Sequence, residues 1–179
     1  TNLDGPTDCL AVLTAANEPA CTYISGCNNC RTGTYVNTAG SDSSTDCINC
    51  VPGQYQDQTG ATACVDCGAG QYAGVAGKET CDDCSIGKSQ PNTAQLQCVD
   101  CTNGKYQDTV GQPECKLCER GTKQPGAGQS SCIACDAGTY ADMGSTTCPL
   151  CESGKADADQ NPASQCIDCS SGEYSPAGA

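Results

Sequence analysis

The stretch Cys98-Val99-Asp100-Cys101-Thr102-Asn103-Gly104-Lys105-Tyr106 is one copy of a unit that repeats along almost the whole chain. The unit reads C-x-x-C-x-x-G-x-Y-x-x-x-x-G-x-x-x, and its first cysteines recur every 16 to 20 residues. Nine such pairs begin at Cys27, Cys47, Cys64, Cys81, Cys98, Cys115, Cys132, Cys148 and Cys166. A fixed period of this kind indicates an array of small units, none of which buries a core alone.

The composition predicts a fold held by disulfides rather than by an apolar core. Only 19 of the 179 residues are Leu, Ile, Val or Met, and there is no Phe or Trp. Burial worth roughly 25 cal/mol per Å² of apolar surface cannot then offset the entropy lost by the ordered backbone. The 20 cysteines supply an alternative, because a cross-link closing a loop of about 15 residues removes roughly 3 kcal/mol of unfolded-state freedom. We therefore predict a small disulfide-rich fold with no single hydrophobic core, formed in an oxidising compartment.

The net charge of −13, from 8 basic and 21 acidic residues, excludes nucleic acid as an expected partner, because phosphate binding requires clustered Lys and Arg. No apolar run approaches the 18 or more residues of a membrane span, and no signal peptide is recognisable. We expect an extracellular or cell-surface protein that is secreted or anchored through a segment outside this sequence.

The first 26 residues do not follow the repeat. They contain Cys9, Cys21 and the most apolar run of the chain, Leu10 to Ala16. Terminal units of repeat arrays are usually atypical because they close an open end. We predict that residues 1–26 form an N-terminal cap held by Cys9, Cys21 and Cys27, and that residues 27–179 form nine tandem modules, the last incomplete.

Glycine and tyrosine occupy fixed places after each cysteine pair. A glycine lies three residues after every second cysteine, at Gly33, Gly53, Gly70, Gly87, Gly104, Gly121, Gly138, Gly154 and Gly172. Six of the seven tyrosines come two residues later, at Tyr35, Tyr55, Tyr72, Tyr106, Tyr140 and Tyr174. A second glycine follows at Gly40, Gly60, Gly77, Gly111, Gly144 and Gly178. Tyrosine favours strands and glycine favours turns or backbone with positive φ. Each module of about 17 residues is therefore predicted to be a short irregular β-hairpin, with little regular secondary structure, and the array to be an elongated rod.

Asp or Asn often precedes the second cysteine of a pair, as at Asn29, Asn49, Asp66, Asp83, Asp100 and Asp168. These side chains commonly bond to nearby backbone in Asx turns. We favour such turns over an acidic, metal-binding stripe.

The repeat resembles the ephrin-receptor-like cysteine-rich repeat, which is related to the first half of a tumour necrosis factor receptor module. Cys50-Val51-Pro52-Gly53-Gln54-Tyr55 and Cys135-Asp136-Ala137-Gly138-Thr139-Tyr140 carry the match, which extends over residues 27–179. Long arrays rich in Thr, Ser, Ala and Gln look most like protist surface proteins, including the GPI-anchored immobilisation antigens of ciliates. The resemblance implies an elongated extracellular rod and no catalytic residue.

In that family the second cysteine of one pair bonds to the first cysteine of the next. The resemblance thus implies the bridges Cys30–Cys47, Cys50–Cys64, Cys67–Cys81, Cys84–Cys98, Cys101–Cys115, Cys118–Cys132, Cys135–Cys148 and Cys151–Cys166. Cys169 is then left for a partner outside this sequence. An interlaced scheme such as Cys64–Cys81 with Cys67–Cys84 is the alternative, because spacing alone does not determine connectivity.

Other chemistry is less well supported. Paired C-x-x-C motifs also form structural zinc sites, but the chain has no His and one pair would be left over. Asp157-Ala158-Asp159-Gln160-Asn161 is a weak match to a calcium loop, with Pro162 where the turn glycine belongs. No histidine is available as a base for nucleophilic hydrolysis. We expect no enzyme activity, no metal and no cofactor.

These observations favour a structural surface-coat protein that assembles with itself, head to tail or laterally, or with other coat proteins. Ser41-Asp42-Ser43-Ser44-Thr45 and similar loops favour O-linked glycans, whereas no N-x-S/T sequon occurs. The alternative is a ligand-binding receptor ectodomain or stalk, which would show an apolar or aromatic patch in a module that departs from the pattern.

Overall fold

A computed structural model describes residues 27–179. The predicted cap and its cysteines Cys9 and Cys21 lie outside these residues, whereas Cys27 is described and is disulfide-bonded. The described chain divides into two compact units. The first comprises 27–68, Tyr72–Asp82 and Thr93–Leu96, and the second comprises Ala69–Gln71, Asp83–Asn92 and Gln97–Ala179.

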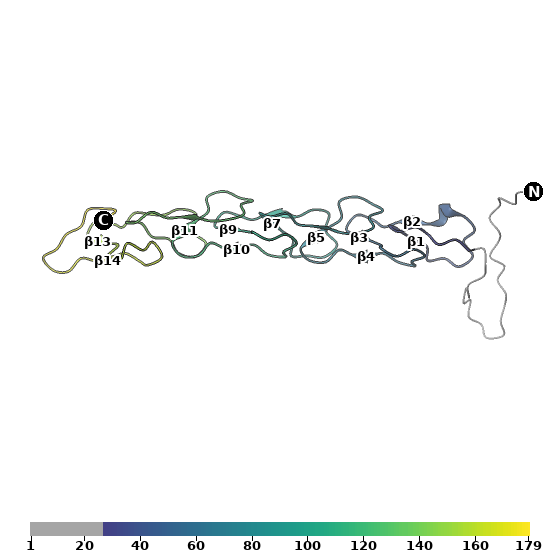
Figure 1. Cartoon of the computed structure of the whole chain (residues 1–179), viewed down its shortest axis with the longest axis horizontal. Helices are drawn as coiled ribbons and strands as arrows, with labels where there is room; N and C mark the ends of the chain where they lie inside the picture. The colour runs from purple at the N-terminus through teal and green to yellow at the C-terminus, as the bar shows by residue number, and fades with distance from the viewer. Residues whose placement is uncertain (1–26) are drawn as a thin grey trace, which may run out of the picture. The chain divides into compact units, whose positions relative to one another are not determined.

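Within residues 27–179, regular secondary structure consists of two-residue strands and one 3-10 helix, and Figure 1 labels most of the strands. In chain order these are β1 (Thr34–Tyr35), η1 (Ser44–Asp46), β2 (Ile48–Asn49), β3 (Gln54–Tyr55), β4 (Val65–Asp66), β5 (Gln71–Tyr72), β6 (Asp82–Asp83), β7 (Lys88–Ser89), β8 (Val99–Asp100), β9 (Lys105–Tyr106), β10 (Lys116–Leu117), β11 (Thr122–Lys123), β12 (Ile133–Ala134), β13 (Lys155–Ala156) and β14 (Ile167–Asp168).

The strands form two-stranded sheets, each joining one repeat to the next. The sheets are β1-β2, β3-β4, β5-β6, β7-β8, β9-β10, β11-β12 and β13-β14. In each sheet the first strand is the pair of residues after the first glycine, and the second strand lies between the two cysteines of the next pair. In the antiparallel β9-β10 sheet, Lys105 is opposite Leu117 and Tyr106 is opposite Lys116. The tyrosine position is therefore a strand position at Tyr35, Tyr55, Tyr72 and Tyr106, as the sequence predicted, whereas Tyr140 and Tyr174 lie in no strand.

We number the modules from the first cysteine of each pair, so that module 1 is 27–46 and module 9 is 166–179, with 47–63, 64–80, 81–97, 98–114, 115–131, 132–147 and 148–165 between them. Successive modules are joined by backbone hydrogen bonds. In the second unit, Gly104 N–H donates to the carbonyl of Gln124 (2.8 Å) and Gln107 N–H donates to that of Gln129 (3.0 Å). In return, Gly128 N–H donates to the carbonyl of Cys101 (2.8 Å). Backbone pairing between neighbours thus takes the place of packing around a common core.

The buried apolar residues of the described chain are seven half-cystines and two alanines: Cys30, Cys50, Cys67, Ala73, Cys84, Cys101, Cys118, Ala141 and Cys151. The large aliphatic side chains are exposed instead, among them Ile48, Val65, Val99, Ile133 and Ile167. The predicted class, tandem disulfide-rich hairpins with little regular secondary structure and no single hydrophobic core, is confirmed.

Candidate functional site

The disulfides form one continuous series along the described chain. Second cysteines are joined to the first cysteines of the following pairs as Cys30–Cys47, Cys50–Cys64, Cys67–Cys81, Cys84–Cys98, Cys101–Cys115, Cys118–Cys132, Cys135–Cys148 and Cys151–Cys166. These are the bridges that the family resemblance implies, and they differ from the interlaced scheme at all sixteen cysteines. Within residues 27–179, Cys169 alone is a free thiol.

In modules 1 to 7 the first glycine is at a place where backbone from two modules further on comes close, whereas Gly154 and Gly172 have no described atom within 4 Å of the place of a methyl group. All nine have positive φ, between +75° and +94°. A methyl group added at Gly104 would lie 2.1 Å from the carbonyl oxygen of Gly144, and one at Gly87 equally close to that of Gly128. Glycine is therefore required here for two reasons, the left-handed backbone and the contact between alternate modules.

The second glycine position also adopts positive φ, and it is not always glycine. Gly128 belongs to this set in addition to the six expected residues, with φ of +70°. In module 4 the position is taken by Ala94 (φ +57°). Modules therefore tolerate a side chain at this turn while keeping its left-handed conformation.

A buried glutamine was not singled out from the sequence. It lies three residues after the first glycine, at Gln56, Gln90, Gln107 and Gln124, and each is at most 7% exposed. In Gln107 the side-chain Nε2 donates to the carbonyl of Glu114 (2.6 Å) and Oε1 accepts from Thr109 N–H (3.1 Å). The side chain thereby holds the hairpin loop of its own module. Its recurrence in four modules was the signal available in the sequence.

Module 8 carries an aspartate at this position. The carboxylate of Asp157 accepts N–H groups from Asn161 (3.0 Å) and from Gly138 (3.1 Å), so it links two modules. Nearby, the Ser164 hydroxyl donates to Asp159 (2.8 Å) and lowers the pKa of that carboxyl. These carboxylates have protein donors as their partners. Nowhere in residues 27–179 do three His, Cys, Asp or Glu side chains gather as metal ligands would.

The acidic residues inside the cysteine pairs do not form the predicted local Asx turns. They lie in strands, and their side chains accept hydrogen bonds across the strand pair. Gln54 Nε2 donates to Asp66 (2.8 Å), Gln71 Nε2 donates to Asp83 (2.8 Å), and Lys88 pairs with Asp100. The prediction was wrong for Asp66, Asp83 and Asp100 because the two-residue strand places each of them opposite the residue after the glycine, twelve positions away.

The tyrosines are half-buried in the hairpins except at the end of the chain. Tyr106 packs beside β10, where the Lys116 ammonium lies 5.8 Å from the centre of its ring. Lys116 also donates to the Asp108 carboxylate (2.6 Å), and this bond, with one from the Thr109 hydroxyl, lowers the pKa of Asp108. Tyr174 is 92% exposed and lies in no strand.

Module 1 departs from the pattern because its disulfide closes a longer loop, with a sequence separation of 17 between the two cysteines against 13 to 15 in modules 2 to 8. The extra residues form η1, capped by the Ser43 hydroxyl, which accepts from Thr45 N–H (3.2 Å). The Asp46 carboxylate accepts from the N–H groups of Asp42 and Ser43. This insertion makes one side of a pocket.

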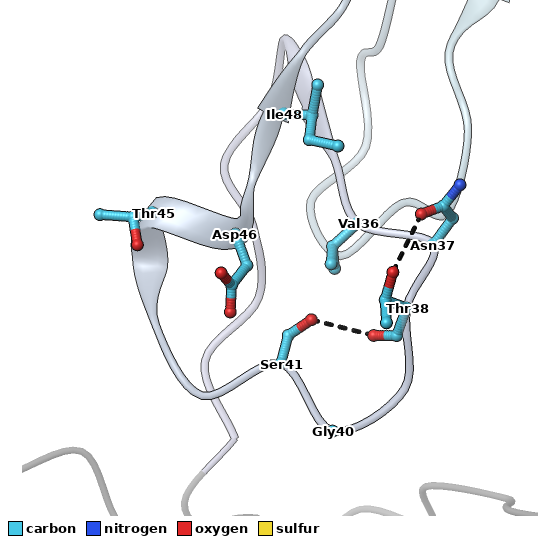
Figure 2. A pocket seen from close by; sticks show the side chains of 8 residues that line it. All are labelled: Val36, Asn37, Thr38, Gly40, Ser41, Thr45, Asp46 and Ile48. Atoms are coloured by element: carbon cyan, nitrogen blue, oxygen red, sulfur yellow. Dashed lines mark hydrogen bonds between the residues drawn. The ribbon is translucent and has the colours of Figure 1, made fainter.

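The module 1 pocket has a volume of about 410 Å³ and is shown in Figure 2. Its lining residues are Val36, Asn37, Thr38, Gly40, Ser41, Thr45, Asp46 and Ile48. Val36 and Ile48 supply its apolar part, and the Ser41 hydroxyl donates to the carbonyl of Thr38 (2.9 Å) at its rim (Figure 2). Thr45 points away from the pocket (Figure 2). The lining of the pocket is thus partly apolar and partly polar.

The described residues include no helix with the length and apolarity required to cross a membrane. Comparison with curated proteins gives no match to this chain. Comparison with family models gives one family, described as tyrosine-protein kinase ephrin type A/B receptor-like, which matches residues 41–76, 89–127 and 104–143. The first span holds 36 residues and the two overlapping spans together hold 55, which is just over half of the 179. The matched spans contain Gly53, Gly70, Gly104, Gly121 and Gly138, with four of the repeat tyrosines and the bridges Cys50–Cys64, Cys101–Cys115 and Cys118–Cys132. The chain therefore belongs to the ephrin-receptor-like family of cysteine-rich repeats.

Proposed function

We propose that this chain is a non-enzymatic structural protein of an extracellular surface coat, of the kind formed by the ciliate immobilisation antigens that its repeat resembles. The observation that carries the proposal is the continuous disulfide ladder, which takes the place of a hydrophobic core in modules 1 to 8. Such a framework persists only in oxidising surroundings. The proposed partners are further copies of the chain or other coat proteins, with O-linked glycans on the Ser- and Thr-rich loops.

The proposed role is mechanical and protective. Each bridge closes a local loop, 14 residues from Cys101 to Cys115, and neighbouring modules hold one another by backbone hydrogen bonds. Stability in such arrays is a sum of local terms. A proteolytic cut in one module therefore leaves the next modules folded, which suits a layer exposed to degradation.

Labelling of intact cells tests this proposal. An antibody against the chain is applied to living source cells, and accessible protein is tagged with a membrane-impermeant amine reagent. A coat protein is expected to be an abundant labelled species, and to be lost when the cells are treated with an external protease. Labelling only after the cells are permeabilised would contradict the proposal. Hexose additions in the intact mass would support the glycans, and an unmodified mass would count against them.

A receptor ectodomain of the tumour necrosis factor receptor-like type is the second candidate. The module 1 pocket favours it, since this module departs from the regular pattern and exposes Ile48 next to a hollow. Copy number separates the two candidates. A coat protein covers the surface and is among its most abundant proteins, whereas a receptor of this type is scarce. The same surface labelling, made quantitative against a protein standard, measures the difference.

A further inference from the structure

One bridge of the ladder differs from the others in the exposure of its two cysteines. Of the eight bridges between cysteines of residues 27–179, seven have one buried half, which is Cys30, Cys50, Cys67, Cys84, Cys101, Cys118 or Cys151. The eighth joins Cys135 to Cys148, and both of these residues are partly exposed. The difference is not an effect of position along the chain, because Cys151 in the following module is 0% exposed.

The turn of the following module covers each buried cysteine, and this cover is absent at Cys135. All seven buried cysteines accept a backbone N–H from that turn at their carbonyl, as Cys118 does from Gly144 (2.8 Å). The turn of module 8 closes on itself instead, because Gln160 N–H donates to the carbonyl of Asp157 (3.1 Å). No backbone N–H of residues 27–179 donates to the carbonyl of Cys135. Module 8 therefore leaves this bridge open to water.

The hairpin that this bridge closes also has less internal pairing than the others. Within residues 27–179 the other seven bridged hairpins each contain a two-residue strand pair, whereas here Thr139 and Leu150 form an isolated bridge. Pro149 occupies the first position of the second strand, where it has no N–H to donate. Ala141 occupies the place of the buried glutamine, so no glutamine amide holds the loop. The hairpin is thus held more weakly where its bridge is more exposed.

Both features favour thiol–disulfide exchange at this bridge. In that reaction a thiolate attacks one sulfur of the bridge, and the other sulfur leaves as a thiolate. The attacked sulfur must be accessible, and an anion that leaves into a buried site without water is costly. Bridges with a buried half, such as Cys101–Cys115, offer only one accessible side and a poorly hydrated leaving group. Cys135–Cys148 has no buried half.

We propose that Cys135–Cys148 is the site at which a low-molecular-weight thiol opens the ladder. The attacking thiolate forms an S–S bond with one of the two cysteines, and the displaced sulfur takes up a proton from water. A second thiol molecule displaces the first from that cysteine, so the bridge gains two electrons and two protons and the thiol is oxidised to its own disulfide. Opening frees residues 136–147, while Cys118–Cys132 and Cys151–Cys166 still close the neighbouring modules. This site goes beyond the coat function and does not depend on it.

The test uses the oxidised 179-residue chain under native conditions. N-ethylmaleimide first blocks the free thiol of Cys169. The chain is then treated with 2-mercaptoethanol, which is neutral and is not repelled by the acidic surface. Samples are quenched with iodoacetamide at increasing times, digested and analysed by mass spectrometry, which gives the rate at which each cysteine acquires the second label.

Cys135 and Cys148 are expected to be labelled at least tenfold faster than Cys101 and Cys115. The bridge Cys67–Cys81 is the matched control, because its module also has alanine, Ala73, in place of the glutamine but keeps its strand pair and a cysteine that is 0% exposed. It should be as slow as Cys101–Cys115. Equal rates at the three bridges, or opening of Cys67–Cys81 first, would overturn the proposal.

A variant tests the role of the hairpin. Pro149→Val restores an N–H at a position where other modules carry Val65 and Val99. It is expected to slow the labelling of Cys135 and Cys148 at least threefold and to leave Cys101 and Cys115 unchanged. A variant labelled as fast as the wild-type chain would contradict the proposal. None of these results bears on the surface-labelling test of the coat function, which involves no thiol.

Discussion

The side-chain amide of Gln107 has two backbone partners within its own hairpin loop and is 1% exposed. Replacing a buried hydrogen-bonding group leaves its partners unsatisfied, at a cost of about 1–3 kcal/mol. Gln107→Ala is therefore expected to lower the protection of the Thr109 amide against hydrogen exchange by at least fivefold. Gln129→Ala is the matched control, because the Gln129 side chain is exposed. Equal effects of the two changes would contradict the assigned role.

Ala94 carries a side chain at a turn where most modules have glycine. Its φ of +57° lies in the left-handed region, which costs a residue with a β-carbon roughly 1–2 kcal/mol. Ala94→Gly is expected to stabilise module 4 by about 0.5–1 kcal/mol, after allowance for the larger entropy of the unfolded glycine. Ala127→Gly, at a position outside the positive-φ set, should have the opposite sign. Hydrogen exchange of the backbone amides of residues 94 and 127 in the two variants measures these two changes in stability.

The Asp108 carboxylate is an exposed reporter of the contact between the hairpin loop and β10. Its pKa lies below the ordinary value of 3.8 because Lys116 and Thr109 donate hydrogen bonds to it. The ion pair therefore stabilises the fold above that ordinary pKa, and the contribution is lost as the pH falls through the lowered value. Lys116→Met is expected to raise the pKa of Asp108 toward 3.8, seen in an NMR titration. Lys105→Met should leave it unchanged, since no ion pair joins Lys105 to Asp108.

At the scale of the hairpin, the first glycine of a module serves two purposes: it adopts positive φ, and it leaves room for backbone of another module. Two substitutions separate these purposes. Gly104 and Gly154 have similar φ, +77° and +83°, but only Gly104 has backbone of another described module against it. Gly154→Ala is expected to cost about 1 kcal/mol for the backbone conformation alone. Gly104→Ala is expected to cost about 1–3 kcal/mol more, because its methyl group would overlap the Gly144 carbonyl.

Amide exchange of modules 5 to 7, measured at concentrations where the chain is monomeric, gives the cost of Gly104→Ala, and that of modules 8 and 9 gives the cost of Gly154→Ala. Equal costs would mean that the close approach of module 7 to module 5 adds no constraint beyond the positive φ.

The period of the cysteines and glycines was sufficient to predict the hairpin, its place in the repeat and the positive φ at residues such as Gly104. These features depend on neighbours within one repeat. The contact of Gly104 with Gly144 was not predictable in the same way, because it joins modules 40 residues apart and no pattern within a single repeat encodes it. Gln107 was overlooked since an isolated glutamine is usually exposed. The prediction of an Asx turn at Asp100 failed because a strand only two residues long shows no alternation of apolar and polar residues by which the sequence could reveal it.

At the scale of the whole described chain, stability is distributed among local bridges rather than gathered in one core. Aliphatic residues that would form a core elsewhere, such as Ile48 and Val99, remain about half exposed here. The groups that are withdrawn from water are mainly sulfur atoms and glutamine amides. Loss of one bridge is therefore expected to loosen its own module and leave distant modules ordered.

Loss of every bridge should have a different result. Full reduction followed by carboxamidomethylation restores the unfolded-state freedom of each loop, which is roughly 3 kcal/mol per bridge in the chain-entropy model. The 19 Leu, Ile, Val and Met residues cannot compensate, because burying one such side chain contributes only about 1.5–3 kcal/mol and most of them are exposed. The alkylated chain is expected to lose its amide protection throughout and to be cut at Arg31, Arg120 and most lysines by brief trypsin treatment. Chain treated with the alkylating reagent alone, without reductant, is the control and should stay protected. Protection that survives full alkylation would show that the backbone joints between modules, rather than the bridges, hold the fold.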